Sequence, residues 1–153
     1  MTSTIAVGVH SLGFLAQAAG DHQEAQRSYR ESIAITEELG DTRGMAGSLH
    51  QLGRVAQENG DYREAHRLYL ESLKIAEELQ DTSGVAAILG QLGVLAEDDG
   101  RLEDAVRLWA EAAAIFRELG SAEVQVVLQW PEEAKEELGE ELFQKILDGE
   151  DIL

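Results

Sequence analysis

The sequence predicts an all-α fold, a solenoid of three helix pairs followed by a C-terminal capping helix. Three observations support it: a 40-residue internal repeat, apolar residues spaced three and four apart, and glycine and aspartate at regular breaks. Without gaps, residues 11–50 and 51–90 are identical at 21 of 40 positions, and residues 51–90 and 91–130 at 12. Such a period indicates stacked supersecondary units. The expected organisation is three repeats over 1–120, at about 1–40, 41–80 and 81–120, and a tail over 121–153.

Each repeat should hold two helices of roughly four turns. Glycine can end a helix in the left-handed conformation, and Asp or Ser can cap the free N–H groups of the next helix. The glycines are Gly20, Gly60 and Gly100, and each is followed by a candidate capping position, at Asp21, Asp61 and Arg101. A second set of capping positions lies 20 residues after the first, at Asp41, Asp81 and Ser121. These positions divide the chain into six helices before residue 121.

The first helix could be mistaken for a secretory signal, because Ile5 to Ala19 is largely apolar. A signal peptide needs Lys or Arg before its apolar stretch, and residues 1 to 20 contain neither. Leu12-Gly13 and Gly20-Asp21 recur 40 residues later. We therefore interpret the segment as the first copy of the repeat.

The helices of the second repeat are amphipathic. Apolar residues recur at steps of three and four, which favours one buried face on each helix. On the first helix they are Ala46, Leu49, Leu52, Val55 and Ala56, and on the second Ala65, Leu68, Tyr69, Leu73, Ile75, Ala76 and Leu79. The third repeat follows the same register.

The tail is expected to close the stack, because an open array must end in a helix with one polar face. Pro131 suits a first helical position. A stripe of Ala134, Leu138, Leu142 and Ile146 opposes a glutamate-rich face, which predicts a capping helix over 131–148. Residues 121–130 are expected to form a short helix, with an extended segment as the alternative.

These residues resemble the tetratricopeptide repeat, a pair of antiparallel helices that stacks into a right-handed superhelix. The signature positions are Leu52, Gly53, Gly60, Tyr62, Ala65 and Tyr69, matched by Leu12, Gly13, Gly20, His22, Ala25 and Tyr29, and by Leu92, Gly93, Gly100, Leu102, Ala105 and Trp109. Gly53 and Ala65 should allow close approach of the paired helices, and Tyr69 should fill the space between one repeat and the next.

The 40-residue period is longer than the family's usual period of about 34 residues. It resembles the longer-helix class in bacterial and archaeal signalling ATPases, transcription regulators and kinesin light chains. The tail, Glu137 to Glu141 followed by Phe143, looks like the end of such sensor arrays. The resemblance implies a free-standing relative or a fragment of a larger regulator.

Charge and composition restrict the classes of molecule that the chain is expected to bind. Thirty acidic and twelve basic residues give a net charge of −18, which repels nucleic acid and anionic membranes. No cysteine is present, so disulfides, thiolate metal sites and cysteine nucleophiles are excluded. The absence of cysteine fits a cytoplasmic protein. A basic or apolar partner segment is favoured.

No motif indicates catalysis. The paired carboxylates Glu37-Glu38 and Glu77-Glu78 recur at the repeat period, as expected of a solvated face. The histidines lack metal-binding spacing, and the acidic cluster near Gly100 lacks the calcium-loop pattern. We expect no enzymatic activity, no cofactor and no metal site.

The resemblance places ligand contacts on the first helix of each repeat, in an inner groove. The corresponding residues are His10, Phe14, Gln17 and Ala18, then His50, Arg54, Gln57 and Glu58, then Gly90, Val94, Glu97 and Asp98. These positions vary between copies, as a site fitted to one ligand or an unconstrained surface would. Phe14 and Arg54 are the expected anchors, because aromatic and Arg side chains dominate interface energetics.

The expected function is therefore a non-enzymatic scaffold that binds a protein or peptide in this groove. Two alternatives stay open. One is a self-associating module whose stack ends pair, since no helix caps Ile5 and Val9 on the first helix. The other is the sensor fragment of a larger regulator.

Overall fold

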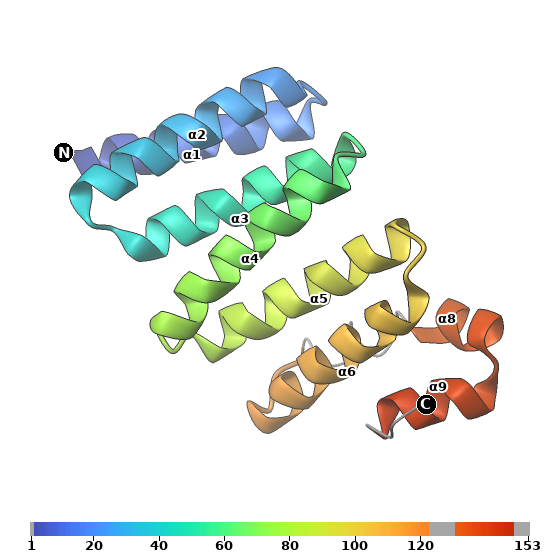
Figure 1. Ribbon diagram of the computed structural model, residues 1–153. Coiled ribbons are helices and arrows are strands. Elements are labelled where there is room, and N and C mark those ends of the chain that lie inside the picture. Colours follow the sequence, from blue (N-terminus) through green and yellow to red (C-terminus); the bar gives the residue numbers. More distant parts are fainter. Residues whose placement is uncertain (1, 123–130, 149–153) are drawn as a thin grey trace. The chain divides into compact units, whose positions relative to one another are not determined.

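The computed structural model describes residues 2–122 and 131–148, and every regular element in those ranges is a helix (Figure 1). The chain forms two compact units, residues 1–80 and 81–153. Unit 1 contains α1 (Thr2–Ala18), α2 (His22–Leu39), α3 (Thr42–Glu58) and α4 (Tyr62–Glu78). Unit 2 contains α5 (Thr82–Asp98), α6 (Leu102–Glu118), α8 (Pro131–Leu138) and α9 (Glu140–Leu147).

Helix boundaries follow the expected punctuation. The carboxylates of Asp21, Asp41, Asp61 and Asp81 each accept a hydrogen bond from the backbone N–H three residues later, which caps α2 to α5. The glycines that precede α2, α4 and α6 have φ between 77° and 79°. Arg101 precedes α6 without a side-chain cap. The six helices before residue 121 are thus confirmed.

Each helix pair is held by an aromatic ring that lies against a glycine. A Cβ atom built on Gly13 would stand 2.8 Å from Cε1 of Tyr29, and one on Gly53 would stand 2.6 Å from Cε1 of Tyr69. In the third pair, Trp109 covers Gly93 in the same way. Any side chain at these positions would displace the ring, so the close approach expected from the sequence is confirmed.

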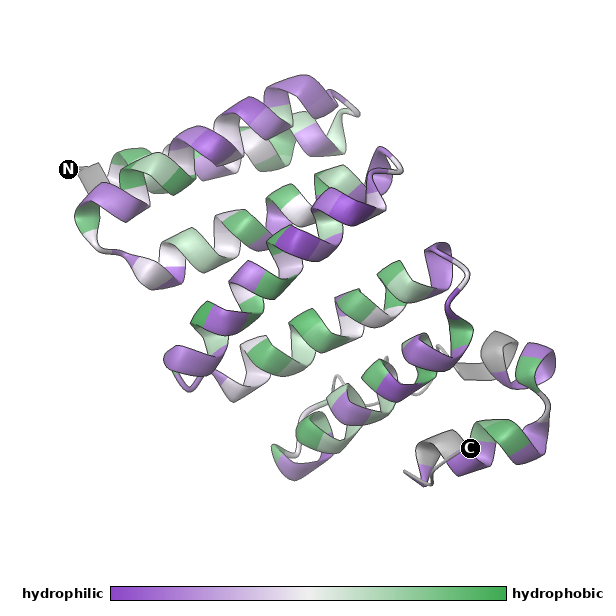
Figure 2. Cartoon of the chain, viewed as in Figure 1, coloured by the Kyte–Doolittle hydropathy of each residue, from purple (hydrophilic) through white to green (hydrophobic). Residues whose placement is uncertain are grey.

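The core is made of the faces that these pairs share. In the second helix of each pair, Ala25, Ala65 and Ala105 are completely buried beside the aromatic residue. Figure 2 shows mixed hydrophilic and hydrophobic residues along α4, whereas hydrophobic residues dominate α5. In α5 the buried residues include Ile88, Leu92 and Leu95.

The tail departs from the sequence expectation. A single helix over 131–148 is wrong, because Gly139 has φ of +84° and separates α8 from α9. A side chain would strain that conformation, but glycine adopts it freely. Both short helices contact α6, and Phe143 of α9 is buried, so the capping role is retained. The side chains of Ala134 and Ile146 lie outside the described residues, as do residues 123–130 of the segment expected over 121–130.

Candidate partner-binding surface

The expected contact residues fall into two sets. Those on α1 and α3 lie in unit 1, where the two helices contact each other. They are His10, Phe14, Gln17 and Ala18 on α1, and His50, Arg54, Gln57 and Glu58 on α3. Gly90, Val94, Glu97 and Asp98 lie on α5 in unit 2. The surface with defined geometry is therefore the one formed by α1 and α3.

A polar network closes one end of this surface. The Tyr29 hydroxyl donates to Oε1 of Gln17, and Nε2 of Gln17 donates to Oε1 of Glu58, both at 2.9 Å. Nδ1 of His22 lies 3.7 Å from Oε2 of Glu58. Gln57 accepts a 2.7 Å hydrogen bond from Tyr69. The two glutamines thus orient the core tyrosines, a role that sequence reasoning did not assign to them.

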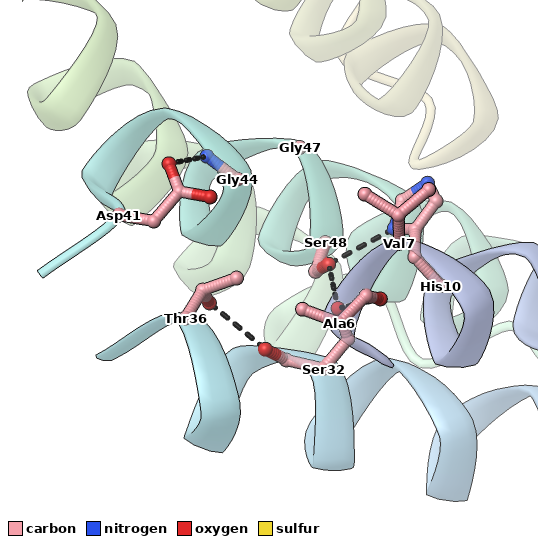
Figure 3. A pocket seen from close by; sticks show the side chains of 9 residues that line it. All are labelled: Ala6, Val7, His10, Ser32, Thr36, Asp41, Gly44, Gly47 and Ser48. Carbon is pink, nitrogen blue, oxygen red and sulfur yellow. Dashed lines mark hydrogen bonds between the residues drawn. The ribbon is translucent and has the colours of Figure 1, made fainter. Parts of the chain in front are cut away.

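A pocket of about 210 Å³ lies at the other end of the surface (Figure 3). Residues of α1, α2 and α3, together with the cap residue Asp41, line it. The lining residues are Ala6, Val7, His10, Ser32, Thr36, Asp41, Gly44, Gly47 and Ser48. Among them, His10 alone was expected from the sequence.

Hydrogen bonds fix the floor of the pocket. The Ser48 hydroxyl lies 2.9 Å from Nδ1 of His10 and donates to the Ser32 hydroxyl at 3.1 Å. Ser32 in turn donates to the carbonyl of Ala6 at 3.2 Å. The chain of bonds ties α1, α2 and α3 together. Ser32 and Ser72 recur at the repeat period on buried faces, a pattern that could have revealed this structural role.

Small residues on α3 keep the pocket open. A Cβ atom on Gly47 would meet nothing within 4 Å, and Ser48 is fully buried. Forty residues later the equivalent positions hold Ala87 and Ile88. The pocket of the first repeat therefore depends on residues that the next repeat lacks.

Burial keeps both surface-lining histidines neutral. It lowers the pKa of His10. Burial also lowers the pKa of His50 to about 4, and the positive charge of Arg54 adds to the effect. The His50 ring meets Tyr69 edge-on at 5.7 Å. At neutral pH these histidines present aromatic surface and no charge.

The expected anchors are accessible. Phe14 is 54% exposed and follows Val7 and His10 at the spacing of one helix face. Arg54 occupies the position equivalent to Phe14 on α3 and is partly exposed. Burial raises the pKa of Tyr29, with the negative charge of Glu58 acting in the same direction and Arg54 opposing it.

The described residues contain no group of three or more metal-binding side chains. None of the helices in residues 2–122 and 131–148 combines the length and apolarity needed to cross a bilayer. The carboxylates of Glu37, Glu38, Glu77 and Glu78 are exposed, in keeping with a solvated face.

Two family models described as tetratricopeptide repeat match the sequence, one over residues 4–78 and the other over residues 85–119. No curated protein is a significant match.

Solved structures with a similar fold include BtubC (BKLC) from P. vanneervenii, with a TM-score of 0.83 and 18% identity over 97% of this chain and 62% of that one. The chain thus spans less than two thirds of that protein.

The N-terminal domain of stress-induced protein-1 from C. elegans has a TM-score of 0.68 and 16% identity over 88% of this chain and 98% of that one. A putative kinesin light chain with TPR-like repeats from Podosopora anserina has a TM-score of 0.71 and 20% identity, and the match covers 94% of this chain and 72% of that one. These likenesses confirm the all-α helical-repeat class. Together with the matched segments they show that the chain belongs to the tetratricopeptide repeat family.

Proposed function

We propose that the chain is a non-enzymatic module that binds an extended protein segment along α1 and α3. Tetratricopeptide repeats generally mediate protein–protein interaction and scaffolding. The observation that carries the proposal is the pocket lined by Val7 and His10. Phe14 follows these two residues on the same face of α1, and the side chains of Val7 and Phe14 are exposed. Concave, mostly apolar sites with a few fixed polar groups are typical binding sites.

The size of the pocket favours a side chain over a small molecule. Its volume of about 210 Å³ lies below the roughly 300–1,000 Å³ of ordinary ligand pockets. We therefore assign it to one aliphatic side chain of the bound segment. From Val7 to Gln17 the helix advances about 15 Å, which about four or five residues of extended peptide would span.

The negative charge of the chain favours basic residues in the rest of the bound segment. The chain carries a net charge of −18, and Asp41 and Glu58 stand at the two ends of the surface. A segment with Lys or Arg beside its apolar anchor is favoured. Exposed charges act over about 8 Å at physiological salt, so added salt should mainly slow association. On α5 of unit 2, Val94, Glu97 and Asp98 are proposed as further partner contacts in their own right. A cytoplasmic location stays a prediction.

The test begins with a random heptapeptide library displayed on phage and selected on the immobilised chain. Peptides that are enriched are then titrated calorimetrically against variants. Gly47→Leu should place an aliphatic side chain in the pocket, and its Cβ atom meets nothing within 4 Å. Phe14→Ala removes the exposed anchor. We expect each variant to weaken binding about tenfold or more.

The matched control is Leu70→Ala on α4, an exposed leucine in the same unit but outside the surface. It should leave affinity unchanged, and all variants should keep the helical circular dichroism of the parent. Affinity that survives both Gly47→Leu and Phe14→Ala would move the site away from α1 and α3. A selection that enriches no peptide would also contradict the proposal.

The alternative of a sensor fragment within a larger regulator stays a prediction. Self-association has an observation of its own, on a different face of α1, and its test does not depend on peptide binding.

A further inference from the structure

Helix α1 carries a second apolar stripe that peptide binding does not use. Ile5, Gly8, Leu12 and Leu15 follow one another at steps of three and four residues, which places them on one face of the helix. Ile5 is 54% exposed, Leu12 59% and Leu15 64%. Val7 and His10, which line the pocket, lie with Phe14 on another face. We call the first set the outer stripe.

The equivalent positions of α3 are covered by a neighbouring helix. Ser48, Leu52 and Val55 stand 40 residues after Gly8, Leu12 and Leu15, and all three are buried. Helix α3 contacts α2, and the Ser48 hydroxyl bonds to Ser32 of that helix. The outer stripe of α1 is thus an apolar surface of the shape that receives another helix.

Charge indicates which helix can cover it. Helix α1 contains no Asp, Glu, Lys or Arg, whereas every other described helix contains acidic residues. Two chains of net charge −18 repel each other across most surfaces. An α1 helix from a second copy brings apolar groups and no like charge to the contact.

The tail rules against a head-to-tail arrangement. The last repeat helix, α6, is contacted by α8 and α9 of its own chain, and Phe143 is buried there. Within residues 2–122 and 131–148, a second copy therefore offers no equivalent open end to place on α1. The remaining arrangement pairs α1 with α1 about a twofold axis, which closes the assembly at two copies.

Gly8 supports close packing of such a pair. It lies inside α1, and a Cβ there would meet nothing within 4 Å of its own chain. Glycine is disfavoured within helices, and the equivalent positions hold Ser48 and Ile88. Without a side chain at position 8, the backbone of a second helix can approach closely.

We propose that the chain forms a twofold homodimer in which the outer stripes of two α1 helices pack against each other near Gly8 and Leu12. The peptide-binding face, with Val7 and Phe14, stays outside this contact. The dimer would therefore present two copies of the binding surface.

The mass in solution tests the dimer directly. Size-exclusion chromatography with light scattering, from roughly 10 to 200 µM, should give twice the mass of one chain. Leu12→Glu places two carboxylates across the twofold axis and should raise the dimer dissociation constant about tenfold or more. Leu70→Glu adds the same charge at an exposed leucine on α4 and should leave the mass unchanged.

A second variant separates specific packing from general stickiness. Gly8→Leu adds exposed apolar surface, so non-specific association would strengthen, but a close helix crossing should weaken about tenfold or more. A monomer at 200 µM, roughly the upper limit of the series, overturns the proposal. So does a mass that grows beyond two chains, or a dimer indifferent to both Leu12→Glu and Gly8→Leu. Because Leu12→Glu leaves the pocket intact, peptide titration of that variant reports on the binding surface independently.

Discussion

Helices α1 and α3 occupy the same place in successive repeats, and their partners within each pair are alike. Each presents a glycine to a tyrosine ring and a glutamine to that tyrosine's hydroxyl. In both pairs a buried serine of the second helix donates to a backbone carbonyl of the first, Ser32 to Ala6 and Ser72 to Ala46. The repeated residues therefore specify the inside of a pair.

Helices α1 and α3 differ in the residues that surround them outside their own pair. Leu12 is 59% exposed, whereas its equivalent Leu52 is buried. His10 bonds to Ser48, but Ile88 occupies the position in the next repeat that is equivalent to Ser48. Equivalent residues thus acquire different roles from neighbours 40 residues away, and this difference can be tested by paired substitutions.

The largest expected difference is between the two leucines. Leu52→Ala should lower the free energy of unfolding by about 2–5 kcal/mol, because it leaves a cavity in the core. Leu12→Ala should change it by less than about 0.5 kcal/mol, because the side chain is exposed. Urea unfolding at the lowest practical protein concentration measures both without a contribution from association. Equal losses would contradict the contrast in burial.

The second difference concerns acid stability. Because folding lowers the pKa of His50 from 6.5 to about 4, the unfolded chain binds the proton first as the pH falls. Stability should then drop between about pH 6.5 and 4, by up to about 3 kcal/mol, and this contribution should change no further below pH 4. Burial acts on His10 with the same sign.

Chemical unfolding across this pH range tests the histidines one at a time. His50→Gln should flatten the slope more than His10→Gln does. The control for the substitution itself is His66→Gln, a change at an exposed histidine. A slope that persists in the His50 variant would assign the acid sensitivity to other groups.

The smallest effect tests the likeness of the pairs. Tyr29→Phe and Tyr69→Phe each remove one hydroxyl that donates to a glutamine, at 2.9 and 2.7 Å. Each should cost about 1 kcal/mol in the free energy of unfolding, the net value of a typical hydrogen bond. Thermal and urea unfolding measure both. A loss confined to one tyrosine would show that the repeated bond differs in strength between pairs.

Helix boundaries were predictable because their causes are local. Asp41 needs only the N–H of Gly44, three residues on, and Gly60 needs only its own backbone freedom. The tail shows where such reasoning fails. The apolar stripe continues past Gly139, so periodicity predicts one helix, but the backbone turns at that glycine and two short helices contact α6.

The sequence predicted which positions contact a partner, but it did not predict the pocket. Family resemblance gave His10, Phe14 and Arg54 as contact residues. The pocket depends on Gly47 and Ser48, which were not among the expected contact residues. Gln17 and Gln57 bond to tyrosines of their own pairs. Sequence spacing alone does not indicate which polar groups already have partners.

By itself the sequence determined the six helices before residue 121 and their pairing, because these depend on residues within one repeat. Tertiary structure alone decided the pocket, the lowered pKa of His50 and the contrast between an exposed Leu12 and a buried Leu52. Each of these depends on which groups lie around a residue in space. Burial and electrostatic shifts are set by that surrounding, so residues in the same repeat register can differ in both.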